Sequence, residues 1–236
     1  MKHIKKGGSP HLYANWQARV AGTSKSSFLE LPRIEKEALL NALIREQGGL
    51  CAYTMRRINN VLSHVEHIKP QTVCRIEAAG SDLDYDNLVA CYPRENLEKK
   101  YSYGAQKKGD WWNNGGVDFV SPLHPSCEKR FRFDLNGEIT PVRNAHSAAT
   151  TIRILRLDHP SLTEIRRRAT REFIYGPSGT DPLSSKSATT AAGAICNRSQ
   201  QNGFTEFCVA IRHALEDHLS ALQKQATRRK FARRKR

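Results

Sequence analysis

Long apolar runs are absent from this chain, and acidic residues are few. No stretch approaches the roughly 18 consecutive apolar residues that a membrane-spanning helix needs. Residues 1–8 also lack the apolar run of a secretory signal. Both absences favour a protein that makes no contact with a membrane, and we expect it in the cytoplasm.

Only 23 Asp and Glu balance 38 Lys and Arg, so the 236 residues carry a formal net charge of +15. A basic chain attracts polyanions, because neutralised phosphates release counterions. The stretch from Lys224 to Arg236 is rich in basic residues and contains no acidic residue. This composition favours nucleic acid as a partner. The alternative is a solvated surface whose tail only aids solubility.

No two of the six cysteines have the spacing C-x-x-C. Without an export signal, a disulfide framework is not expected. Most of these thiols are expected to be buried as small apolar groups.

The hydrophobic pattern predicts an α+β fold in four parts. Residues 1–31 show little periodicity and are expected to form an arm. Residues 32–145 begin with a helix near Pro32 and continue with several β-like runs. Residues 146–223 are expected to be helical, and 224–236 form the basic tail.

Turn residues and periodicity locate the elements inside these parts. Asn136-Gly137 is a hairpin signal between two short β-like runs. Residues 84–91 favour a helix start followed by an apolar turn. Helices are expected at 148–157, 162–174 and 205–223, strands at 50–53, 63–68, 117–120, 131–133 and 138–140, and a loop at 176–193.

The segment His64-Val65-Glu66-His67-Ile68-Lys69-Pro70 is the most informative for chemistry. On a strand, His64 and Glu66 share one face and His67 lies on the other. A carboxylate can hold a hard divalent cation, and a neutral imidazole can accept a proton from water. The alternative is a polar surface strand, since a short motif can match by chance.

The wider pattern resembles the HNH nuclease motif, which has a ββα-metal (His-Me finger) fold. Gly49-Leu50-Cys51-Ala52-Tyr53 precedes the segment, Asp86-Asn87-Leu88 follows it, and Asn96 lies nine positions after Asn87. The resemblance implies an endonuclease core with helical additions before and after it. It also implies hydrolysis of phosphodiester bonds with one Mg²⁺ or Mn²⁺ ion, giving 5′-phosphate and 3′-hydroxyl ends.

The roles implied by the resemblance fall on individual residues. His67 matches the general base, and Glu66 matches the acidic metal ligand. Asn87 matches the asparagine that braces the loop beside the base. Asn96 occupies the place of the second metal ligand, with Gln106 as the alternative. His64 matches an additional residue that helps to bind metal or phosphate.

Two departures from the family concern a structural zinc site. Position 54, where the first C-x-x-C pair would end, is Thr. Of the second cysteine pair of the zinc motif, only Cys91 is present, and it lies one position earlier than the common spacing of the family would place it. Cys51 and Cys91 are therefore interpreted as remnants, and no structural zinc is expected.

Further stretches resemble the PtuB-like nuclease subunit of Septu-type antiphage systems. They include Met1 to Lys6, Val120-Ser121-Pro122-Leu123, Phe131-Arg132-Phe133 and the run from Thr151 to Leu157. This resemblance implies an ABC-type ATPase as partner, and in some systems a retron reverse transcriptase with its reverse-transcribed DNA.

Basic side chains are expected to contact phosphates without reading sequence. The alternative for the arginine-rich helix at 162–174 is a solvated or ion-paired face. A competing function is a non-catalytic nucleic-acid-binding or assembly subunit on a decayed HNH scaffold. The expected phosphate contacts are Lys99, Lys107, Lys108, Arg166, Arg167 and Arg171, with Arg168 and the tail beside them.

Overall fold

The computed structural model describes residues 1–94 and 103–234, and its architecture mixes α-helices with two small antiparallel sheets. In chain order the helices are α1 (His11–Val20), α2 (Arg33–Glu46), α3 (Gln71–Glu77), α4 (Ala105–Lys108), α5 (His146–Leu155), α6 (Pro160–Tyr175), α7 (Ser185–Ala194) and α8 (Cys208–Arg234), and the strands are β1 (His64–His67), β2 (Leu88–Cys91), β3 (Phe131–Phe133) and β4 (Ile139–Pro141).

In the first sheet, β1, which contains the residues of the sequence motif, pairs with the buried strand β2. All four residues of β2 are fully buried, and Glu66 and His67 lie opposite Val89 and Leu88. A continuous apolar run is typical of a strand covered on both faces. The expected helix start at 84–91 is therefore wrong beyond Asn87, where a short 3-10 turn gives way to this strand.

The second sheet is the expected hairpin of β3 and β4. Its turn contains Gly137 with φ +77°, and an added Cβ there would lie 2.4 Å from the carbonyl oxygen of Thr163. Only glycine suits both the backbone angle and the close approach of α6. The strand expected at 117–120 is wrong, since these residues follow a turn built on two glycines with positive φ. The strand expected at 50–53 is also wrong, because the chain turns at 52–54 and leaves only an isolated bridge between Leu50 and Arg57.

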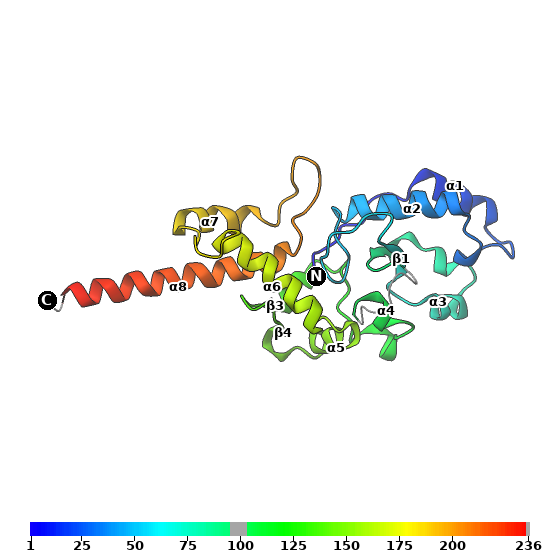
Figure 1. Cartoon of the computed structure of the whole chain (residues 1–236). Helices are drawn as coiled ribbons and strands as arrows, with labels where there is room; N and C mark the ends of the chain where they lie inside the picture. Colours follow the sequence, from blue (N-terminus) through cyan, green and yellow to red (C-terminus); the bar gives the residue numbers. More distant parts are fainter. Residues whose placement is uncertain (95–102, 235–236) are drawn as a thin grey trace.

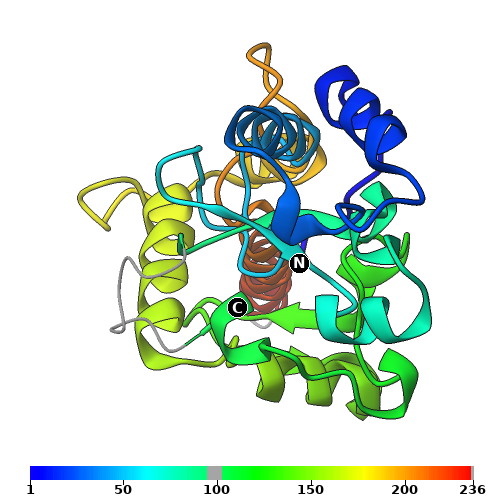
Figure 2. The same ribbon diagram turned by 90° about the vertical axis from the view of Figure 1, so that its right-hand side faces the viewer.

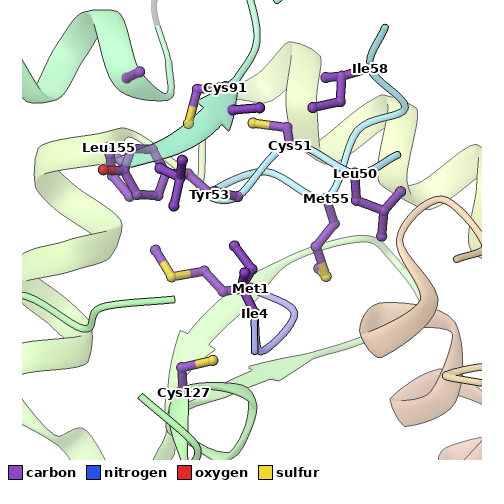
Figure 3. Close-up of a cluster of buried hydrophobic side chains, with 14 of the residues drawn as sticks. Met1, Ile4, Leu50, Cys51, Tyr53, Met55, Ile58, Cys91, Cys127 and Leu155 are labelled. Atoms are coloured by element: carbon purple, nitrogen blue, oxygen red, sulfur yellow. The ribbon is translucent and has the colours of Figure 1, made fainter. Parts of the chain in front are cut away.

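The N-terminal segment, expected to form an arm, contains helix α1, which packs against the body of the protein. Tyr13 and Trp16 of α1 are buried, and the Tyr13 hydroxyl donates to the carbonyl of Leu83 at 2.6 Å. Figure 3 shows Met1 and Ile4 packed in the same core as Cys51 and Leu155. Residues far apart in the sequence thus share one core.

The C-terminal region contains more helix than expected. Residues 185–194 form α7, because the hydroxyl of Ser184 accepts a hydrogen bond from the Ser187 amide and alanine favours helix. α7 and β3 pack against the first half of α8, where Arg132 binds Glu216 and Asp217. Figure 1 shows the rest of α8 extending away from the body, and Figure 2 shows it nearly end-on.

No helix among the described residues is both long enough and apolar enough to cross a bilayer.

Candidate active site

Strand β1 divides the motif residues between two faces. His64 and Glu66 lie on one face and His67 on the other, as the two-residue period of a strand predicts. The His64 Nε2 atom lies 3.7 Å from a carboxylate oxygen of Glu66. The structure therefore brings these two side chains together and separates the His67 ring from them.

The Glu66 carboxylate is held by three polar groups. The Lys108 ammonium lies 3.0 Å from Oε1, and the Tyr53 hydroxyl lies 3.4 Å from the same oxygen. His64 faces the other oxygen, Oε2. Burial raises the pKa of Glu66, but the hydrogen bond from His64 and the charge of Lys108 outweigh burial and leave that pKa below its ordinary value. Glu66 is therefore an anion.

His64 has a defined orientation. Its Nδ1 atom lies 2.6 Å from the carbonyl oxygen of Pro93. A carbonyl oxygen only accepts, so Nδ1 carries a hydrogen, and Nε2 is directed at Glu66. Metal-binding histidines usually have this type of outer hydrogen bond.

The His67 ring is buried, with 4 % of its surface exposed, and both nitrogens have partners. Nε2 lies 2.8 Å from the carbonyl oxygen of Asp82, and Nδ1 lies 3.2 Å from Nε2 of Gln71. Phe28 packs edge-on against the ring with centroids 4.6 Å apart. Burial lowers the pKa of His67, so the neutral form predominates near pH 7.

Asn87 connects the end of β1 to the start of β2. Its Oδ1 atom accepts from the Lys69 amide at 2.8 Å, and its Nδ2 atom donates to the Lys69 carbonyl at 2.9 Å. The backbone carbonyl of Asn87 also accepts from the Ile68 amide at 3.0 Å. These bonds fix the two residues that follow His67, so Asn87 lies where a brace for the base would act.

Lys108 is not the surface cation that we expected to contact nucleic acid. Its side chain is 1 % exposed. The ammonium also donates to the carbonyl of His67 at 2.9 Å and lies 3.4 Å from that of Gly109. Because its ammonium group is bound by these oxygen atoms, Lys108 is part of the site around Glu66. Its neighbour Lys107 is exposed.

The arginines of α6 also differ from expectation. Arg166 is buried, and its guanidinium donates to the carbonyls of Gly137 and Leu157, so it holds the β3–β4 turn and cannot reach a phosphate. Arg167 is ion-paired with Glu164, as is Arg168. Arg171 is exposed and lies over the Tyr175 ring.

The two cysteines interpreted as zinc remnants lie side by side in the core. The Cys91 thiol makes a hydrogen bond with Cys51, and the Tyr92 amide donates to the Cys51 sulfur at 3.4 Å. Burial raises the pKa of Cys91 well above its ordinary value, which keeps it a thiol. The buried side chain of Thr54 stands where a further ligand would be. Figure 3 shows both sulfurs among apolar side chains.

Two expected site residues, Asn96 and Lys99, lie outside the described residues. The alternative ligand, Gln106, is exposed on α4. Across residues 1–94 and 103–234, no three His, Cys, Asp or Glu side chains form a group that could hold a metal ion.

Three residues of the site were missed by sequence reasoning. Gln71 and Arg75 follow His67 at intervals of four, the spacing at which side chains become neighbours along a helix. This spacing could have predicted both residues. Asp82 gave no such signal, because it lies in a separate 3-10 helix, Ser81–Leu83, that only the tertiary structure brings to His67.

The comparison with family models gave no match. The chain is, however, 31% identical over 145 residues to a protein of Vibrio cholerae serotype O1 biovar El Tor named "Retron Vc95 putative HNH endonuclease". The matched region covers 59% of this chain and 67% of that relative. The motif on β1, the Asn87 contacts and this similarity agree, and the chain belongs to the HNH endonuclease family.

Proposed function

We propose that this protein hydrolyses phosphodiester bonds of nucleic acid, with His67 as general base. The observation that carries the proposal is the 2.8 Å contact between His67 Nε2 and the Asp82 carbonyl. Because that carbonyl can only accept, the hydrogen of the neutral ring stays on Nε2 and the lone pair stays on Nδ1. An imidazole in this form can take a proton from water.

In the proposed reaction, a water oxygen bonds to phosphorus while the bond to the 3′-oxygen breaks. His67 Nδ1 takes the proton of that water, and the 3′-oxygen takes a proton from solvent. The products are a 5′-phosphate and a 3′-hydroxyl. Asn87 fixes the backbone after His67, which keeps the ring in place during the proton transfer.

The residues of the Glu66 face fit a divalent cation. Glu66 is anionic, its Oε1 is bound by Lys108, and its Oε2 faces an imidazole that is oriented by the Pro93 carbonyl. We infer that Glu66 and His64 hold Mg²⁺ or Mn²⁺, with Asn96 as the further ligand, since Mg²⁺ takes few protein ligands and keeps several waters. When bound, the ion offsets negative charge at the phosphate and the leaving oxygen.

The projecting part of α8 is proposed to bind the nucleic-acid backbone. Its exposed basic residues include Lys224, Arg228, Arg229 and Lys230, and no acidic residue follows Asp217. Positive charge lies all round this part of the helix, which suits phosphate contacts more than an apolar partner. With Arg166 and Lys108 buried, α8, Lys107 and Arg171 carry this role.

The wider context is proposed from the relative and the resemblance. The Vibrio cholerae relative is named as a retron protein. We infer that this chain is an effector subunit of a Septu- or retron-type antiphage complex, with an ABC-type ATPase and, in retron systems, a reverse transcriptase and its DNA as partners. Cys51 and Cys91 have no third metal ligand beside them in the part of the chain that the structure describes, and this favours the alternative, a non-catalytic binding subunit on the same scaffold.

Cleavage by the purified protein tests the proposal. We expect it to cut DNA or RNA with Mg²⁺ or Mn²⁺ and to stop with chelator. His67→Ala should lower the rate by about 10²- to 10⁴-fold while nucleic-acid binding is kept. His124→Ala, an exposed histidine away from β1, is the matched control and should cut like wild type. Equal rates for His67→Ala and wild type contradict the assignment.

A further inference from the structure

A closed circuit of hydrogen bonds surrounds the His67 ring. Asp82 forms both ends of the circuit: its backbone carbonyl accepts from His67 Nε2, and its carboxylate binds Arg75 Nε at 3.0 Å. Arg75 also donates from its terminal nitrogen to Gln71 Oε1. Gln71 Nε2 then reaches His67 Nδ1 at 3.2 Å.

The direction of every bond in the circuit follows from the groups that form it. A guanidinium only donates, so Arg75 turns Gln71 Oε1 toward itself and leaves Gln71 Nε2 facing His67. Gln71 therefore donates to His67 Nδ1, the same nitrogen that the Asp82 carbonyl leaves without a hydrogen. The Gln71 amide covers the nitrogen that the proposed reaction uses.

The members of the circuit differ in how freely they can move. Asp82 is fully buried and also accepts from Ser27 and the Phe28 amide, so it is fixed. Gln71 is the first residue of α3 and is half-buried, and the Arg75 side chain is 36% exposed. Gln71 can thus turn away from His67 without disturbing the core.

We propose that Gln71 is a positioning residue that acts as a latch, a side chain that holds the place of the attacking water on His67 Nδ1. A proton acceptor must come within about 3 Å of the water that it deprotonates. At 3.2 Å the Gln71 amide fills this position, so water binds only when Gln71 swings out. The inference rests on the proposed function in assigning His67 as the base, and it adds a step that controls access to that base.

Two measurements on the full chain test the latch with Gln71→Ala. The first is the rate at which diethyl pyrocarbonate, which modifies unprotonated imidazole nitrogens, labels His67 in the absence of metal and nucleic acid. The second is kcat and KM for DNA cleavage. Thr72→Ala, the exposed next residue of α3, is the matched control. The buried His213 reports in the same labelling experiment that the fold is intact.

We expect Gln71→Ala to raise both the labelling rate of His67 and kcat by about two- to tenfold, the effect of removing one neutral hydrogen bond. KM and the protection of His213 should stay at the wild-type values, and Thr72→Ala should change nothing. Gln71→Asn, whose shorter amide cannot reach Nδ1, should behave like Gln71→Ala.

Two results would overturn the latch. One is a Gln71→Ala protein whose His67 labels at the wild-type rate. The other is a kcat that falls as far as that of His67→Ala, since Gln71 would then assist the reaction directly. A wild-type protein that cleaves nothing refutes the proposed function alone, because the labelling experiment does not depend on cleavage.

Discussion

The Lys108 ammonium lies 3.0 Å from Oε1 of Glu66, with only 1 % of the lysine side chain exposed. The carboxylate proposed to bind metal therefore already has a fixed positive partner. One consequence is that Glu66 is anionic before any metal binds. Another is that its second oxygen, which faces His64, is the one directed to the proposed ion.

Replacement of Lys108 by Met should destabilise the fold by about 3 kcal/mol, because it leaves Glu66 as a buried anion without its partner. Glu66→Gln together with Lys108→Met should recover much of that loss, since the double variant has no buried charge. Urea unfolding of the four proteins of this cycle measures the coupling. Lys107→Met, on the exposed face of α4, should stay within about 0.5 kcal/mol of wild type. Additive losses in the cycle would show that the two groups do not interact.

The midpoint of the decline in kcat with falling pH should lie below pH 6.5. The reason is that burial lowers the pKa of His67 below 6.5, and a general base works in its neutral form. A pH profile of kcat with Mg²⁺ checks this. A midpoint at or above pH 7 would mean that a different group is the base.

The free energy of unfolding should also fall as the pH falls below 6.5. In the unfolded chain, histidines take up a proton near pH 6.5. Folded His67 and His213 resist this protonation because burial lowers their pKa values, that of His213 to about 4. Unfolding is therefore favoured increasingly as pH falls from about 6.5 toward 4, while above 6.5 these groups have no effect. Urea unfolding at a series of pH values measures this trend, and a free energy of unfolding that rises over the same range would contradict it.

Neutralising the projecting part of α8 should weaken nucleic-acid binding without slowing catalysis. We expect substitution of Lys224, Arg228, Arg229 and Lys230 by Gln to reduce the slope of log Kd against log salt by about 0.9 for each duplex-DNA phosphate that these side chains neutralise in the wild type. The value of kcat at saturating DNA should stay unchanged. Titrations at several salt concentrations measure the slope.

The matched control for α8 is Arg167→Gln with Arg168→Gln, since both arginines are already paired with Glu164. This pair of substitutions should leave the slope close to wild type. A quadruple α8 variant with the wild-type slope would show that nucleic acid lies elsewhere on the protein.

Local sequence patterns correctly predicted the features that depend on short-range geometry. The alternation His64-Val65-Glu66-His67 predicted which side chains share a face, and Asn136-Gly137 predicted the β3–β4 hairpin. Charge and propensity were less reliable guides. Arg166 looked like a surface cation, yet packing places it under the β3–β4 turn with hydrogen bonds to two backbone carbonyls.

The order of residues along the chain specifies the chemistry available: a carboxylate and two imidazoles on one strand, followed by an asparagine and a basic helix. Which of these groups meet depends on the packing of distant segments. Lys108 reaches Glu66 across 42 positions, and Asp82 closes the circuit around His67 from a 3-10 helix 15 positions away. Such contacts depend on how helices and loops pack, and no periodicity along the chain encodes that packing.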